Sequence, residues 1–255
     1  MENKALRALM DEWKEEHYKK GYDHFIYDGC ADYDTYINTP YRILIVGKEA
    51  YVTDDDPKND PRFVRKEGDK LTWYWTDSIQ DAAPRPKHST YMGFCVGILD
   101  KMAEERLIPK KKYSYKNVAL LDLKKSRDPA DPDSPKKGDS NTKDIRTIIR
   151  FAEEDREWIR KEIALLQPDL IIFHGTYQCA DIVLGKDKRI IHNYEEEQPA
   201  KKNRGMRALY EYNVDYTDNP STVKVLDMYH LSADRFHSSD WRSSRTEQIV
   251  DALTK

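Results

Sequence analysis

The sequence predicts an α/β fold, a three-layer αβα sandwich around a central, mainly parallel four-stranded sheet. The first observation is a set of short, continuous apolar runs, which are typical of strands covered on both faces. These runs span residues 42–46, 117–123, 170–173 and 223–226. The second observation is that helical patterns separate the runs. Strands that alternate with helices form parallel sheets with helices on both faces.

Apolar residues at helical spacing mark the helices in chain order. The first helix is predicted over residues 4–20, and Gly21 ends it because glycine readily adopts the left-handed conformation that follows a helix. The same spacing predicts further helices over residues 91–102, 145–166, 180–184 and 249–253.

Two polar stretches are predicted to be surface loops rather than domain boundaries. Residues 127–144 contain three prolines and almost no apolar side chain, and residues 193–204 are similarly polar. Neither stretch is long enough to separate domains. We therefore expect one domain over residues 1–255, with residues 1–21 forming its N-terminal helix.

The composition favours a folded protein outside the membrane. A chain of 255 residues can bury a large core, and its 17 Tyr, 5 Trp and 6 Phe argue against disorder. No apolar run approaches the roughly 20 residues that cross a bilayer. Asp11 and Glu12 interrupt the only early apolar stretch, where a signal peptide would lie. A cytoplasmic location is therefore expected.

The charged residues and the cysteines narrow the classes of partner. The 43 Lys and Arg against 46 Asp and Glu give a net charge of −3, so any contact with DNA must come from a local basic patch. Cys30, Cys95 and Cys179 lie far apart and form no CxxC pair. We expect three buried thiols, and we expect neither a metal, an iron–sulfur cluster nor another cofactor.

Polar residues follow the apolar runs, at the strand ends where ligands gather in a parallel sheet. Gly47 allows a ligand to approach the backbone closely, and Glu49 is expected to face the crevice. Asp122 lies inside the second run, where a carboxylate is costly unless it is ion-paired or accepts hydrogen bonds from a bound group. His174 ends the third run, where the free N–H groups of a helix start would suit an anion, but a structural role is favoured for the histidine itself.

The fourth run leads to His230, with Ser232 two residues later. Glu49 and His230, from the first and last strands, are expected to form an acid/base or charge-stabilising pair. The chain contains neither GxGxxG nor the P-loop pattern, and no GxSxG surrounds Ser232. Dinucleotide-binding, P-loop and serine-hydrolase functions therefore lose support.

In this order, the motifs resemble those of the uracil-DNA glycosylase-like superfamily, over most of the chain. Residues 47–51 (Gly-Lys-Glu-Ala-Tyr) resemble the first motif, a glycine followed by an acidic catalytic residue and, in some branches, a tyrosine. Residues 167–175 resemble the proline-containing approach to the third strand and its terminal glycine. Residues 229–232 (Tyr-His-Leu-Ser) resemble the last motif, which is usually His-Pro-Ser.

The departures from these motifs indicate a divergent branch. Ala50 and Leu231 each stand where relatives commonly carry proline, and Asp122 stands where many carry an asparagine that reads uracil. A carboxylate only accepts hydrogen bonds, so it would repel O4 of uracil and accept from the exocyclic amine of cytosine. The resemblance therefore implies a modified cytosine or uracil as the base, with the cytosine type favoured.

The resemblance implies a DNA glycosylase that hydrolyses the N-glycosidic bond of a flipped-out base. Glu49 would stabilise the sugar cation and orient water, and His230 would donate a hydrogen bond to the departing base. Gly47, Tyr51, Phe63 and Asp122 would bind the base, with Trp73, Tyr74 and Trp75 as rivals of Phe63 for stacking. The expected DNA contacts are Lys124, Lys125, Ser232, Arg235 and Phe236, the last two lying where relatives insert a wedge.

Two other functions stay open. The altered motifs fit an inactive member of the fold that binds nucleic acid or a protein partner. The acidic net charge favours an N-glycosidase of free nucleosides or nucleotides. The favoured partner is duplex or single-stranded DNA, and no membrane contact is expected.

Overall fold

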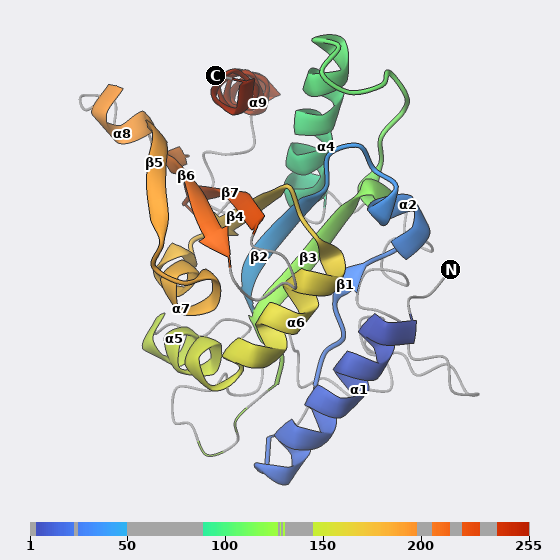
Figure 1. Ribbon diagram of the computed structural model, residues 1–255, viewed down its shortest axis with the longest axis vertical. Coiled ribbons are helices and arrows are strands. Elements are labelled where there is room, and N and C mark those ends of the chain that lie inside the picture. The colour runs from blue at the N-terminus through green and yellow to red at the C-terminus, as the bar shows by residue number, and fades with distance from the viewer. Residues whose placement is uncertain are drawn as a thin grey trace.

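The computed structural model describes residues 4–22, 25–49, 89–126, 128, 130, 145–197, 206–214, 221–229 and 239–254. Within these residues, seven strands form one mixed sheet in the spatial order β1-β3-β2-β4-β7-β6-β5 (Figure 1). The strands are β1 (Gly29–Cys30), β2 (Ile43–Glu49), β3 (Val118–Lys124), β4 (Leu170–His174), β5 (Lys188–Asn193), β6 (Met206–Val214) and β7 (Ser221–Met228). The predicted α/β class is confirmed, whereas the prediction of a four-stranded sheet is wrong.

The four predicted strands form the centre of the sheet. β2 pairs in parallel with β3 on one side and with β4 on the other, and β4 pairs in parallel with β7. β1 is antiparallel to β3 at one edge, while β6 and then β5 continue from β7 in antiparallel pairing. These outer strands lack the continuous apolar runs of the centre, because β1 has two residues and β5 is partly exposed on both faces.

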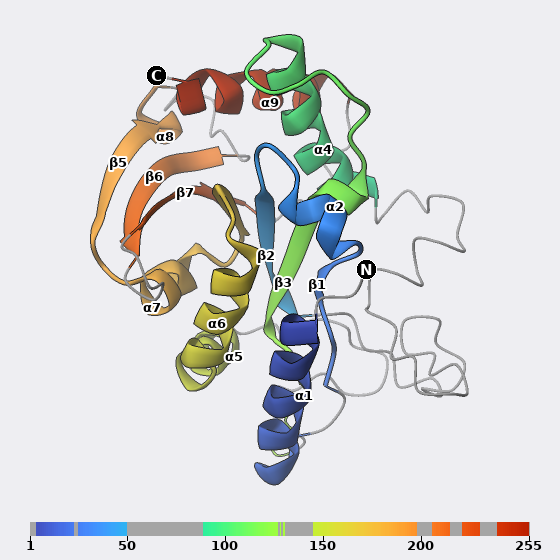
Figure 2. The same cartoon turned by 45° about the vertical axis from the view of Figure 1, so that its right-hand side comes forward.

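Helices cover both faces of the sheet. α1 (Lys4–Lys19), α5 (Ile145–Glu154), α6 (Arg156–Leu166) and α7 (Ala180–Leu184) bury their apolar sides against one face. α4 (Ser89–Glu104) and α9 (Ser239–Thr254) cover the other, and Figure 2 shows these two helices together above the sheet. The shorter helices are α2 (Tyr33–Ile37), α8 (Tyr194–Glu197) and two 3₁₀ turns, η1 (Tyr115–Asn117) and η2 (Tyr177–Cys179).

Two predicted elements differ from the structure. The long helix expected over residues 145–166 is two helices, α5 and α6, separated at Asp155. The Asp155 carboxylate is buried and lies 2.9 Å from Nε2 of His17 in α1, so a tertiary contact holds the break. The loop expected at residues 193–204 begins instead with the end of β5 and with α8. Most of the loop predicted at 127–144 lies outside the described residues, as do parts of the single domain predicted over 1–255.

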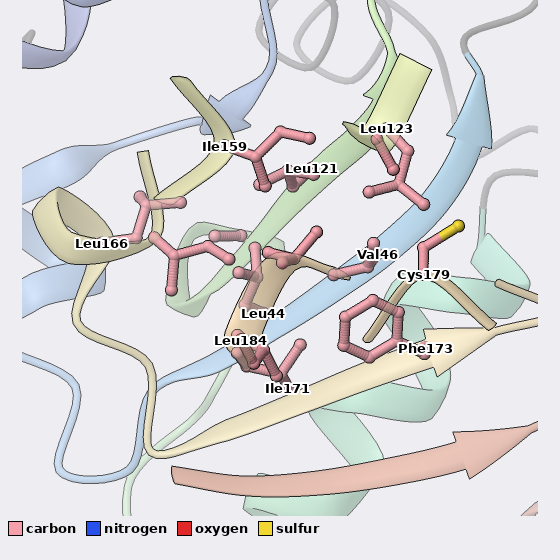
Figure 3. Packing of buried hydrophobic residues seen from close by; sticks show 14 of the residues in the cluster. Leu44, Val46, Leu121, Leu123, Ile159, Leu166, Ile171, Phe173, Cys179 and Leu184 are labelled. Atoms are coloured by element: carbon pink, nitrogen blue, oxygen red, sulfur yellow. The ribbon is translucent and has the colours of Figure 1, made fainter. Parts of the chain in front are cut away.

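The core explains why the central strands are apolar throughout. Leu44 and Val46 of β2 belong to the core on the α6 side, whereas Ile43 and Ile45 belong to the core on the α4 side. Both faces of β2 are thus buried, as expected of a central parallel strand. Figure 3 shows the α6-side cluster, in which side chains of β2, β3 and β4 interdigitate with those of α6 and α7. All three cysteines are free and buried, as predicted.

A buried lysine joins four segments of this fold. The side chain of Lys125, just after β3, is fully buried and contacts the carboxylates of Asp28 and Glu162, the latter at 3.0 Å. Its ammonium nitrogen also lies 5.0 Å from the ring centre of Trp13 in α1. Burial alone would lower the pKa of Lys125, but the two carboxylates outweigh it and raise the pKa above its usual value. Burial raises the pKa of Glu162, and Asp28 adds to that rise while Lys125 opposes it.

Among the described residues, no helix combines the length and the apolar character that crossing a membrane requires.

Replacing Lys125 by alanine should strongly destabilise the fold, because it leaves a buried carboxylate without its counter-charge. We expect the free energy of unfolding to fall by about 3–5 kcal/mol, as for other broken buried pairs. Urea unfolding followed by circular dichroism measures this loss. Lys19→Ala, at an exposed lysine of α1, is the control and should unfold like the unaltered protein. A Lys125→Ala variant as stable as the control would contradict the assigned role.

Candidate active site at the carboxyl edge of the sheet

The order of the parallel strands creates a switch point beside β2. The chain passes from β2 to β3 on one side, and then from β3 across to β4 on the other side of β2. In open α/β sheets, ligands bind outside the carboxyl ends of the strands at such a point. The relevant edge here holds the ends of β3, β2, β4 and β7.

Three residues of this edge come together on neighbouring strands. Gly47 of β2 is in register with Asp122 of β3, and Val46 is in register with Phe173, so His174 of β4 is the next residue along. Side chains alternate along a strand, and the residues two positions earlier belong to the core beneath α4. These are Ile45, Leu120 and Ile172. Gly47, Asp122 and His174 therefore share one face of the sheet.

Gly47 is required because Asp122 and His174 occupy the space beside it. A Cβ atom on Gly47 would lie 2.4 Å from Oδ1 of Asp122 and 3.4 Å from Nε2 of His174. Contacts below 3 Å are not tolerated by a real methyl group, so only glycine fits here while the carboxylate keeps its place. A carboxylate and an imidazole thus converge over the end of β2, and each residue is 5 % exposed.

The backbone after β4 is anchored to both neighbouring strands. Thr176 donates a hydrogen bond from Oγ1 to the carbonyl oxygen of Val46 at 3.0 Å. Gly175 donates from its backbone nitrogen to the carbonyl oxygen of Met228 at 2.7 Å. Gly175 has φ +73°, a left-handed conformation that glycine adopts without strain. The position of His174 is therefore fixed from both sides.

The described part of the chain includes only some of the predicted site. Glu49 is the last residue of β2 and is in register with Lys124, and its backbone lies at this edge. Tyr51, Phe63, His230, Ser232, Arg235 and Phe236 lie outside the described residues, as do the stacking rivals Trp73, Tyr74 and Trp75. Their roles, and that of the Glu49 side chain, stay predictions.

Lys124 and Lys125, two of the predicted DNA contacts, are covered by other parts of the fold. Both are buried, at 3 % and 1 % exposure. Lys124 places its ammonium 5.7 Å from the ring centre of Phe151, and Lys125 forms the buried ion pairs described above. The sequence showed two adjacent lysines after a strand but did not show that α5, α6 and α1 cover them.

Sequence reasoning also missed a charged cluster at the end of β7. Asp227 is 3 % exposed, and one of its oxygens lies 3.6 Å from Nη1 of Arg207. Arg207 also contacts Glu195 at 3.2 Å, and its guanidinium lies 5.4 Å from the ring centre of Tyr229. Burial raises the pKa of Asp227 to about 6, with Arg207 opposing the shift and Glu195 adding to it. The sequence feature that could have identified Asp227 is an acidic residue near the end of a strand, which is also the position of Asp122.

The sequence alone did not indicate that His174 lies near Asp122, because this proximity depends on the order of the strands in the sheet.

Within the described ranges, no three His, Cys, Asp or Glu side chains gather as metal ligands would. Comparisons with protein-family models and with curated protein sequences find no match to this chain.

Gly47→Ala should displace the Asp122 carboxylate and destabilise the protein. We expect a cost of about 1–3 kcal/mol, typical of adding a methyl group to a filled space. Gly97→Ala is the matched control, because among the described residues a Cβ there would meet Thr246 at an ordinary 3.5 Å, and alanine suits the interior of α4. That variant should gain about 0.5–1 kcal/mol. Urea unfolding of both variants measures the difference, and equal effects would refute the close approach at Gly47.

Asp227 should make stability depend on pH below neutrality. Its pKa in the folded protein, about 6, exceeds its usual value of 3.8, so the folded state binds the proton more tightly than the unfolded state. This contribution to the free energy of unfolding therefore decreases as the pH rises from about 4 to 6, and is constant above that range. Asp227→Asn removes this titration. The free energy of unfolding of the variant, minus that of the unaltered protein, should therefore rise by up to about 3 kcal/mol as the pH increases across this window. Denaturant unfolding at several pH values tests this, and a pH-independent difference would contradict it.

Proposed function

We propose that the protein is a DNA glycosylase with a uracil-DNA glycosylase-like fold, hydrolysing the N-glycosidic bond of a flipped-out base. The observation that carries this proposal is the convergence of Asp122 and His174 over Gly47, beside the strand that ends in Glu49. A carboxylate, an imidazole and a second acidic residue at a switch point are groups suited to base recognition and bond cleavage.

The location of the motifs supports the same proposal. The motif of residues 47–51 begins within β2, Asp122 lies in β3, and residues 167–175 lead into and out of β4. The motif of residues 229–232 follows β7 directly. These segments are far apart in the chain, yet the strands that carry them are neighbours and end at one edge. A shared active site requires this arrangement.

The proposed reaction breaks the bond between C1′ of the sugar and the base nitrogen. The oxygen of a water molecule bonds to C1′, the base leaves with the bonding electron pair, and the proton released by the water neutralises the base. Glu49 stabilises the cationic sugar and orients the water, and His230 donates a hydrogen bond to the anionic base. Tyr51 and Phe63 enclose the base.

The burial of Asp122 favours an aminopyrimidine over uracil. Its carboxylate lies in a site with 5 % exposure, where a carbonyl oxygen facing it would bring two acceptors together. An exocyclic amine supplies that donor. A modified cytosine is therefore the proposed base.

A second candidate is an N-glycosidase of free nucleosides or nucleotides. It is favoured by the burial of Lys124 and Lys125, which removes two predicted phosphate contacts from a chain with a net charge of −3. It predicts release of the base from small substrates and DNA binding that is weak at any salt concentration, whereas a DNA glycosylase loses affinity steeply with added salt.

A base-release assay tests the proposal. Duplex and single-stranded DNA carrying uracil, hypoxanthine, cytosine or modified cytosines is incubated with the protein, and abasic sites are then cleaved with alkali. We expect strand breaks with a cytosine-type base, reduced at least about 100-fold in Glu49→Gln. Release from free nucleotides alone would establish the second candidate. No release from any substrate would reject both enzymes, and retained DNA binding would then indicate an inactive binding member.

Asp122→Asn should shift the base preference towards uracil, because the amide adds a donor for O4. We expect the ratio of uracil to cytosine-type release to rise at least about 10-fold, a difference of about 1.4 kcal/mol. The same assay measures the ratio. An unchanged ratio would exclude Asp122 as the residue that reads the base.

A further inference from the structure

The segment before β1 runs beside the end of β3 and contacts it with a side chain. Gly29 and Cys30 pair with Leu120 and Ala119 in antiparallel register. Further along, Ile26 donates a backbone hydrogen bond to the carbonyl oxygen of Lys125 at 2.8 Å. Between these contacts, the backbone N–H of Asp122 donates to Oδ2 of Asp28. A buried carboxylate thus takes the place that a backbone carbonyl has in an ordinary ladder.

Lys125 pairs with the Asp28 carboxylate in this place. Asp28, Lys125 and Glu162 are all fully buried in their side chains, so water does not balance their charges. The single ammonium faces two carboxylates, but Asp28 also receives the N–H of Asp122, whereas burial favours the protonated form of Glu162. Asp28 thus joins the ammonium of Lys125 to the backbone N–H of Asp122, and a carboxylate acceptor makes the hydrogen bond from Asp122 stronger than a neutral acceptor would.

Asp122 is consequently held from both sides. Asp28 fixes its backbone on the β1 side, and the missing side chain of Gly47 provides the space for its carboxylate on the β2 side. The Asp122 carboxylate fills this space, because its Oδ1 lies 2.4 Å from where a Cβ atom on Gly47 would be. A shift of the Asp122 backbone therefore moves the carboxylate out of this space.

We propose that Asp28, held by Lys125, is a positioning residue that fixes the Asp122 carboxylate where it meets the base and thereby sets base preference. The base-reading part rests on the proposed function. The lysine that the sequence assigned to DNA contact acts instead beneath the site, through Asp28.

Asp28→Asn tests this role, because it keeps the shape of the side chain and removes its charge. We expect amide hydrogen exchange at Asp122, measured by NMR, to become at least about 10-fold faster relative to the other amides of β3. We also expect the ratio of cytosine-type to uracil release to change at least about 5-fold, or kcat to fall by that factor at unchanged KM.

Asp155→Asn is the matched control. Asp155 is equally buried and is paired with His17 of α1 at 2.9 Å, but it lies between α5 and α6 rather than beside β3. This variant should lose stability without changing exchange at Asp122 or base preference. Equal changes in the two variants would reduce Asp28 to a stabilising residue and overturn the proposal.

A second variant covers the case in which Asp28→Asn does not fold. The double variant Asp28→Asn with Lys125→Met removes both charges and keeps the apolar stem of the lysine. It should show the same faster exchange at Asp122, and unchanged exchange would overturn the proposal. If the unaltered protein releases no base, the proposed function fails, while exchange at Asp122 still decides whether Asp28 positions it.

Discussion

The buried ammonium of Lys125 is the interaction on which one half of the fold depends. A charge in the core is tolerated only with its counter-charge beside it, and here Asp28 and Glu162 come from opposite sides while Trp13 covers the nitrogen. The segment before β1, β3, α6 and α1 must therefore assemble together. Because Asp28 also accepts the N–H of Asp122, the charge balance of the core extends to the carboxyl edge of the sheet.

At that edge, the space around Gly47, rather than charge pairing, decides which side chains fit. β2 lies between β3 and β4, so a side chain at Gly47 would compete with groups from both neighbours. The absence of a side chain lets Asp122 and His174 approach each other over the strand. Gly47, expected from the sequence to let a ligand approach the backbone, leaves room in the structure for the side chains of Asp122 and His174.

The electrostatics of the described surface bear on the substrate. Two of the lysines that could have contacted phosphate are buried, and Arg207 is balanced by Asp227 and Glu195. A glycosylase built on this chain would draw its phosphate contacts from other basic residues, whereas a nucleotide N-glycosidase would need few. The salt dependence of DNA binding therefore separates the two enzymes independently of catalysis.

The sequence by itself determined the centre of the fold, because a strand covered on both faces must be apolar throughout. This rule located β2, β3, β4 and β7, and with them the strand ends that hold Gly47, Glu49 and Asp122. Only the tertiary structure decided the outer strands, the break at Asp155, the burial of Lys125 and the approach of His174 to Asp122. Each of these depends on contacts between residues distant in the chain, where burial and charge pairing override the local pattern.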